Sequence, residues 1–329
     1  MSSTYRFFAW LGCFVALVAC SNPPAGQSSA APGALATESA VNSVAPTASV
    51  VASASASSPV LPAPPAPVVT TTPVMFEVKK GDVVAGYLFG TMHTGVDAEK
   101  ELNPIVFRKL DLAKVVVMEA DVFNVDPFEI AKTAMYPPGK SVKKDLAPGR
   151  WQIVVDRLSS FMLPESSLAQ MKPWFIGTML VQKMLPEVEP IDSVLYKRAE
   201  KAGKKLVYVE TVKEQLDMVE KSFDVKVLDD MLGDMKKTEA MTLDLADAYR
   251  KGDVEKLTKL TFDAEEMKKH PPMFDLLFFA RNSKWVPKLV PLLDQGGVFV
   301  AVGAGHLLGD KGVPALLVKQ GYSVERIKP

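Results

Sequence analysis

The chain has 329 residues, and its 38 Lys and Arg side chains balance 38 Asp and Glu side chains, so the formal net charge is zero. Nucleic-acid-binding proteins usually carry a clear excess of basic residues, and this balance therefore argues against a nucleic-acid partner. Hydrophobic residues make up 48% of the sequence, as in a globular protein, although an Ala-rich first quarter inflates that share.

The N-terminus has the features of a targeting segment. Arg6 is the only early charge, and residues 7–19 form an almost wholly apolar run with the length of a signal-peptide core. The run ends in Leu17–Cys20, which resembles the lipobox of bacterial lipoproteins. We therefore expect residues 1–19 to be a lipoprotein signal peptide and Cys20 to be lipidated, with a plain signal peptide as the alternative.

A lipidated Cys20 would attach the chain to a membrane of the bacterial cell envelope, since several acyl chains on one Cys anchor stably. Ser21 follows it and is compatible with sorting to the outer membrane. Cys13 and Cys20 are the only cysteines. If the first leaves with the signal peptide and the second is acylated, the folded part contains no disulfide, Cys metal site or Cys nucleophile.

Residues 20–73 are predicted to be a disordered tether. Ala, Ser, Pro, Val and Thr make up most of the stretch from Pro23 to Thr72, and Glu38 is its single charge. Such a segment buries too little apolar surface to offset the entropy lost on ordering. We expect it to hold a domain of residues 74–329 away from the membrane.

The first half of this domain predicts a hairpin, a helix, a strand and a helical insertion. Residues 75–78 and 83–89 flank turn-forming residues and are typical of a β-hairpin. Residues 102–112 have helical spacing, and the continuous apolar run 115–118 is typical of a strand buried on both faces. Residues 126–190 predict several helices broken by prolines, inserted between the two halves of the domain.

The second half predicts helices that alternate with short strands. The expected helices span residues 191–202, 212–219, 225–250, 254–260, 273–293 and 313–320. The expected strands span residues 206–209, 298–302 and 322–327. We expect an interruption of the helix 273–293 at Pro287 or Pro291. The alternation indicates an α/β fold with a mixed, largely buried sheet flanked by helices.

Polar side chains follow four of the predicted strands: His93, Glu119, Glu210 and His306. The chain has three His, and two of them stand three residues after a Gly at such strand ends. Sites in α/β folds form outside the carboxyl ends of strands. Two imidazoles and a carboxylate are a natural ligand set for a divalent metal ion. We therefore expect His93, His306 and Glu119 to bind a metal.

A metal in this position would lower the pKa of bound water, and Glu119 or Glu210 would serve as general base. Arg281 would stabilise an oxyanion or bind a substrate carboxylate. The alternative for Glu119 and Glu210 is helix capping or ion pairing, and the alternative for Arg281 is an ion pair on the surface. His270 is expected to be a loop residue. The sequence lacks both a Gly-x-Ser-x-Gly elbow and a His-Glu-x-x-His helix, so neither a serine hydrolase nor an ordinary zincin is indicated.

Five segments of the domain, taken in order, resemble the TraB/GumN family: residues 88–93, 118–121, 209–215, 281–285 and 302–312. That family is similar to the Tiki metalloproteases and belongs to a wider group with erythromycin esterase-like and ChaN-like proteins. The resemblance implies an α/β fold and a site built from two Gly-x-x-His motifs, a Glu and an Arg. It adds Asn282 as a further catalytic candidate, a second choice together with Glu210.

Carried onto this chain, the resemblance makes His93 and His306 the metal-ligand or catalytic pair and Glu119 the carboxylate. It makes Arg281 the contact to the substrate or oxyanion. The Tiki branch implies metal-dependent proteolysis, with manganese or cobalt preferred over a tightly held zinc.

Three hypotheses follow for the function. The leading one is a membrane-anchored, metal-dependent hydrolase, a peptidase acting on a peptide or protein of the cell envelope. The alternative is a non-catalytic module that sequesters a peptide, haem or another small ligand in the same pocket. A purely structural envelope protein would give no reason for polar residues at four strand ends.

Overall fold

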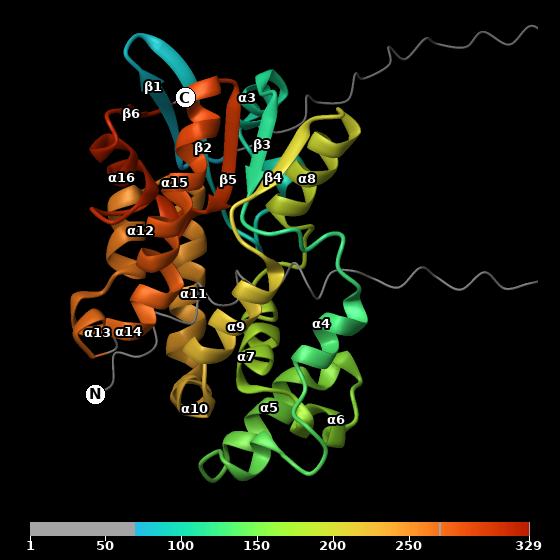
Figure 1. Ribbon diagram of the computed structural model, residues 1–329. Coiled ribbons are helices and arrows are strands. Elements are labelled where there is room, and N and C mark those ends of the chain that lie inside the picture. Colours follow the sequence, from blue (N-terminus) through green and yellow to red (C-terminus); the bar gives the residue numbers. More distant parts are fainter. Residues whose placement is uncertain (1–69, 270, 329) are drawn as a thin grey trace, which may run out of the picture. The chain divides into compact units, whose positions relative to one another are not determined.

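The computed structural model describes residues 70–328 with the exception of residue 270 (Figure 1). The predicted signal peptide, nearly all of the tether, the lipidation site Cys20 and the predicted loop residue His270 lie outside this part. Within residues 70–328, no helix is long and apolar enough to cross a membrane.

Six strands form one mixed sheet in the order β4-β3-β5-β2-β1-β6 (Figure 1). Their bounds are β1 Met75–Lys80, β2 Val83–Thr91, β3 Val115–Met118, β4 Lys205–Tyr208, β5 Val298–Gly303 and β6 Ser323–Arg326. The neighbours β4, β3, β5 and β2 run parallel, and β1 pairs antiparallel with both β2 and β6. The predicted α/β class and the hairpin are therefore confirmed. The parallel strands also bring four carboxyl ends to one edge of the sheet.

Helices account for most of the other residues that the structure describes. The α-helices are α2 Ala98–Glu101, α3 Pro104–Leu112, α4 Pro127–Thr133, α5 Arg150–Leu158, α6 Glu165–Gln170, α7 Pro173–Gln182, α8 Ile191–Lys201, α9 Val212–Ser222, α10 Val225–Gly233, α11 Met235–Arg250, α12 Val254–Thr261, α13 Ala264–Lys269, α14 Pro271–Phe274, α15 Ala280–Gln295 and α16 Val313–Lys319. Tighter 3-10 turns are η2 Val142–Lys144, η3 Ser159–Phe161 and η5 Ala304–Leu307, and η4 Asp275–Phe279 is a π-helical turn.

The prediction of a single long helix over residues 225–250 is wrong. This stretch forms two helices, α10 and α11, and Asp234 stands between them. The side chain of Asp234 accepts a hydrogen bond from the backbone N–H of Lys237 at 3.1 Å and so caps the second helix. A capping Asp at this point satisfies a backbone donor that an uninterrupted helix would use elsewhere.

The interruption predicted at Pro287 or Pro291 is also wrong, because α15 passes through both prolines. Both are exposed, so water reaches the backbone carbonyls that lose a partner there. The irregular step lies earlier, in the π-helical turn η4 that leads into α15. Turns of this kind are frequent at functional sites, and this one ends two residues before Arg281.

The sheet is buried on both faces. Neighbouring residues of β2 point to opposite sides, so Phe89 packs with α3, α8, α11 and α12, whereas Leu88 packs with α15 and α16. A third apolar cluster joins α5, α6 and α7 of the insertion to α9, α10 and η4. Figure 1 shows α5 and α6 away from the sheet. The carboxyl ends of the parallel strands therefore lie beside helices from both halves of the chain.

Candidate functional site

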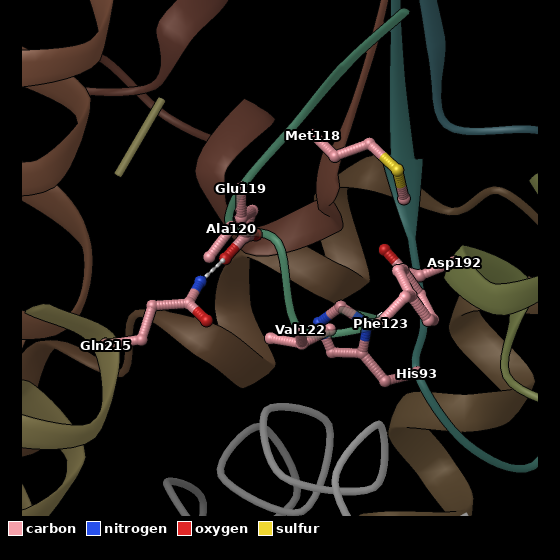
Figure 2. A pocket seen from close by; sticks show the side chains of 8 residues that line it. All are labelled: His93, Met118, Glu119, Ala120, Val122, Phe123, Asp192 and Gln215. Atoms are coloured by element: carbon pink, nitrogen blue, oxygen red, sulfur yellow. Dashed lines mark hydrogen bonds and ion pairs between the residues drawn. The ribbon is translucent and has the colours of Figure 1, made fainter. Parts of the chain in front are cut away.

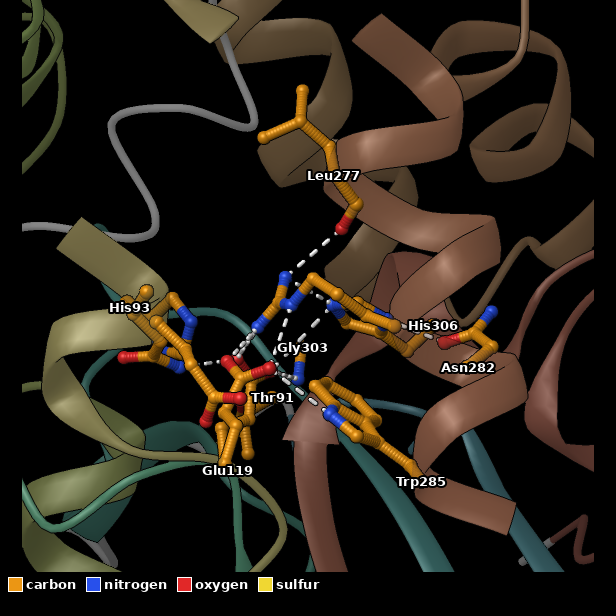
Figure 3. Close-up of polar contacts among 12 residues, drawn as sticks. Thr91, His93, Glu119, Leu277, Asn282, Trp285, Gly303 and His306 are labelled. Atoms are coloured by element: carbon orange, nitrogen blue, oxygen red, sulfur yellow. Dashed lines mark hydrogen bonds and ion pairs between the residues drawn. The ribbon is translucent and has the colours of Figure 1, made fainter. Parts of the chain in front are cut away.

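The residues predicted from the strand ends lie on four neighbouring strands. His93 follows β2, Glu119 directly follows β3, Glu210 follows β4, and His306 lies in η5 immediately after β5. All four are found at the shared carboxyl edge of the sheet. Figure 3 shows His93 and His306 on opposite sides of Glu119, with Asn282 and Trp285 of α15 close to His306.

Arg281 is the centre of the polar contacts in this region. Its Nε and Nη2 donate to the two carboxylate oxygens of Glu210 at 3.0 and 2.5 Å, and Nη2 also donates to Glu119 Oε2 at 2.7 Å. Its Nη1 donates to the Leu277 carbonyl and to His306 Nε2, both at 2.9 Å. Since a guanidinium has five N–H groups, these contacts employ all of them. An oxyanion or substrate carboxylate would have to replace one of these acceptors.

Two carboxylates keep this buried guanidinium charged. Burial by itself lowers the pKa of Arg281, but the charges and hydrogen bonds of Glu210 and Glu119 outweigh it and raise the pKa. Trp285 adds a second donor to Glu210, with its Nε1 at 3.0 Å from Oε2, and its ring lies 4.7 Å from the guanidinium carbon. The ion pair is thus bidentate and stacked, an arrangement for which Lys has no equivalent.

Glu119 accepts hydrogen bonds from three different parts of the chain. Besides Arg281, Gln215 Nε2 donates to Oε2 at 3.0 Å, and the backbone N–H of Gly303 donates to Oε1 at 2.7 Å. The pKa of Glu119 is raised overall, because burial outweighs the opposing charge of Arg281 and the charge of Glu210 adds to the increase. Because all three neighbours are donors, the contacts suit the ionised carboxylate. Glu119 therefore connects β3, β5, α9 and α15.

His306 is held in a single neutral tautomer. The amide nitrogen of Asn282 donates to the Lys311 carbonyl at 2.8 Å, which leaves its Oδ1 facing His306 Nδ1 at 2.7 Å. Nδ1 therefore carries the proton, and Nε2 accepts from Arg281. Burial and then the charges of Arg281 and His93 move the pKa of His306 well below its usual 6.5.

His93 has the opposite surroundings. Its Nδ1 makes a short hydrogen bond to the carboxylate of Asp192, whose other oxygen accepts from Thr91 Oγ1 at 2.9 Å. Burial lowers the pKa of His93, but the charge and hydrogen bond of Asp192, together with the charge of Glu119, raise it overall. The hydrogen bond to Asp192 favours the tautomer in which Nε2 carries the lone pair.

Asp192 is the site residue that sequence reasoning missed. It lies in the first turn of α8, where an acidic residue ordinarily complements the helix dipole. No local pattern distinguishes it from any other acidic residue at a helix start. Only its burial and its contact with His93, 99 positions earlier in the chain, identify it.

A small pocket opens beside His93 and Glu119 (Figure 2). Asp192, Gln215 and Phe123 also line it. Its volume is about 20 Å³, which is enough for about one water molecule. Such a water would lie among a carboxylate, an amide and an imidazole, and these groups supply the polar partners that a bound water requires.

The side chains of His93, His306 and Glu119 are not arranged to bind one metal ion together. Among residues 70–328, with residue 270 excepted, no group of three or more His, Cys, Asp or Glu is arranged to hold a metal ion. The Nε2 of His306 accepts from Arg281, and the same guanidinium contacts Glu119. A protein cation therefore stands between two of the three predicted ligands.

Comparison with known proteins finds a matching family and a relative that is similar over a short stretch. The model of the TraB/PrgY/gumN family matches residues 74–326. Over 56 residues the chain is 38% identical to a protein described as "Metalloprotease TIKI homolog" from Nematostella vectensis. That stretch covers 16% of this chain and only 12% of the relative, so the chain matches a small part of that protein's length. No solved structure matches.

Proposed function

Since the chain belongs to the TraB/PrgY/gumN family, and one stretch is similar to a metalloprotease homolog, we propose that it is a hydrolase that cleaves peptide bonds. The observation that carries this proposal is the water-sized pocket between His93 and Glu119. A general base held by a carboxylate, beside a position for water, is the arrangement that hydrolysis of an amide requires.

In this proposal His93 is the general base. Glu119 and Glu210 were also candidates, but all four of their carboxylate oxygens already accept hydrogen bonds from protein donors. Asp192 holds the imidazole in one orientation and stabilises the imidazolium that forms when Nε2 takes a proton. Its buried position keeps that stabilisation free of competing solvent.

The proposed reaction has two steps. The water oxygen attacks the carbonyl carbon of a peptide bond while His93 Nε2 removes one of its protons. The C–N bond then breaks, and His93 returns the proton to the leaving nitrogen. Glu119 orients the water, and Arg281 acts through Glu119 by fixing the position of that carboxylate.

The similarity to a metalloprotease suggests a divalent metal, for which manganese, cobalt and zinc are the candidates. When bound, such an ion would lower the pKa of water and polarise a carbonyl. The described donors do not fit such an ion, and the two proposed steps use only side chains of the protein and a water molecule. Metal content measured by mass spectrometry, and activity before and after chelation with re-addition of each ion, decide whether it takes part.

The test of the proposed function is cleavage of a peptide mixture by the purified full chain, followed by mass spectrometry. Asp192→Asn keeps the shape of the side chain but removes the charge that stabilises imidazolium, so we expect kcat to fall by about 10²–10⁴. Asp156→Asn, which changes an exposed Asp on α5, is the matched control and should leave kcat unchanged.

Three outcomes separate the hypotheses. Peptides that stay intact and unbound, with or without added manganese, cobalt or zinc, overturn the proposal. Peptides that bind saturably and are recovered intact favour the non-catalytic binding module. Cleavage that persists at the wild-type rate in Asp192→Asn keeps the hydrolase but removes His93 from the role of base.

We also propose that the protein acts in the bacterial cell envelope, attached through lipid on Cys20. The lipobox-like Leu17–Cys20 supports this location. Full-length wild type is expected in the detergent-soluble membrane fraction, labelled by a clickable palmitate analogue. Cys20→Ala should lose both the label and the membrane association, and a variant that keeps both contradicts the lipid anchor.

A further inference from the structure

A second, larger pocket lies against Arg281 on the side of Glu210. It has a volume of about 230 Å³ and lies between α9 and the helix formed by η4 and α15. A pocket of this size takes a side chain or a chain terminus rather than a whole peptide. Its charged lining consists of three ammonium groups and three carboxylates besides Arg281, namely Lys221, Lys284, Lys288, Glu210, Glu214 and Asp217.

The three carboxylates are already engaged by the protein. Glu210 accepts both contacts from Arg281 described above. Glu214 belongs to the capping box at the start of α9, where its side chain accepts from the N-cap residue. Asp217 accepts from Lys213 at 2.5 Å. Each negative charge in the lining therefore has its own donor.

The ammonium groups are engaged to a smaller extent. Lys288 donates to the Val209 carbonyl at 2.5 Å. Across the part of the chain that the structure describes, no hydrogen bond or ion pair engages Lys221 or Lys284. Two positive charges thus face the pocket without a fixed protein partner, whereas its negative charges are all paired.

The charges of Lys284 and Lys288 act on Glu214, a carboxylate that lines the pocket. Hydrogen bonds from Thr211 are the main cause of the lowered pKa of Glu214, and the charges of Lys288 and Lys284 lower it further. The lining also has an apolar part, because Met218 and the partly exposed Leu276 belong to it. An anionic group that carries a short aliphatic stem would match both features.

We propose that this pocket is a substrate subsite for a peptide carboxylate, either an acidic side chain or a free C-terminus. The inference rests on the proposed peptidase function and names the class of peptide that it would prefer. Arg281 and Glu210 form a wall of the subsite, and Arg281 also binds Glu119 in the water-sized pocket. A peptide carboxylate on Lys221 and Lys284 would therefore lie beside the same ion-pair network that positions the water.

The experiment measures binding, so it does not depend on turnover. The probe is a fluorescein-labelled Ala-rich hexapeptide with two Glu residues and a free C-terminus, and its twin has two Gln residues and an amidated C-terminus. Fluorescence anisotropy with the full chain gives the two Kd values. We expect the acidic peptide to bind about tenfold more tightly at low ionic strength, and added salt should reduce the difference.

The variant Lys221→Gln/Lys284→Gln should bind both peptides with the Kd of the Gln twin. Lys201→Gln/Lys205→Gln removes the same charge from exposed positions outside the pocket, and it should keep the preference. Equal Kd values for the two peptides, or an equal loss in the control variant, overturn the subsite. Inorganic phosphate that binds as tightly as the acidic peptide reduces the pocket to a general anion site and also overturns it.

The outcomes remain distinguishable from those for the proposed function. A preference for the acidic peptide without any cleavage supports the subsite and counts against the peptidase. Cleavage without such a preference supports the peptidase and counts against the subsite.

Discussion

The two strand ends share the Gly-x-x-His pattern, but the surroundings of their imidazoles are electrostatically opposite. His93 contacts the carboxylate of Asp192, and its pKa is raised. His306 contacts the guanidinium of Arg281 and the amide of Asn282, and its pKa is lowered. A shared motif therefore determines where an imidazole stands, whereas residues from distant helices determine its charge and its capacity as a base.

Because their surroundings differ, the rings of His93 and His306 have different roles. His93 is able to accept a proton, because a carboxylate stabilises the imidazolium that forms. His306 stays neutral and accepts a hydrogen bond, so it helps to hold Arg281 in place. Three variants or conditions test this comparison, in order of decreasing expected effect.

Removal of Arg281 should have the largest effect, on both the stability of the protein and the difference between the two histidines. Arg281→Gln leaves Glu119 and Glu210 buried beside each other without their cation, and we expect the free energy of unfolding to fall by about 3–5 kcal/mol. It also removes one charge that lowers the pKa of His306, so that pKa should rise toward the behaviour of His93. Urea unfolding and NMR titration of the His306 ring measure the two effects.

Arg157→Gln is the matched control for this variant. Arg157 Nη1 lies 3.4 Å from Glu239, and both side chains are about 40% exposed, so their ion pair should contribute about 0–1 kcal/mol. An Arg281 variant that unfolds at the same urea concentration as this control would contradict the central role of the guanidinium.

Gly90→Ala should disturb the contact that keeps the two strand ends together. An added Cβ would lie 2.8 Å from the Cα of Ala304 and 2.9 Å from its Cβ, which is too close for packed atoms. We expect a loss of about 1–3 kcal/mol in the free energy of unfolding. The double variant Gly90→Ala/Ala304→Gly should regain part of it, since one of the two close contacts is removed. No loss in the single variant would show that the strand ends separate at little cost.

The pH dependence of stability should show the two histidines with opposite signs. The folded pKa of His306 is below 6.5, so the unfolded chain takes up the proton first, and stability falls as the pH drops below 6.5. The folded pKa of His93 is above 6.5, so its contribution is complete below 6.5 and is lost as the pH rises through the folded pKa. Each limb should have a slope of at most about 1.4 kcal/mol per pH unit.

Urea unfolding between about pH 5 and 9 measures both limbs. His306→Gln should flatten the acidic limb, and His93→Gln should flatten the alkaline limb. If His93→Gln instead flattens the acidic limb, the assignment of charge to the two rings is reversed.

The sequence predicted a large part of the fold. The strands over residues 115–118 and 298–302 appear almost as expected, because a continuous apolar run favours a strand buried on both faces. The errors arose where a local signal competed with its surroundings. Asp234 capped a new helix within an apparently continuous amphipathic pattern, and α15 continued through two prolines whose lost hydrogen bonds face water.

For the site, the sequence by itself determined the strand ends at which His93, Glu119, Glu210 and His306 stand. Strand periodicity is local, and the carboxyl ends of parallel strands necessarily share one edge. Tertiary structure alone decided that Arg281 occupies the centre of the network and that Asp192 holds His93. The physical reason is that the charge state of a buried group depends on neighbours across space, and these lie roughly 100 to 160 positions away along the chain.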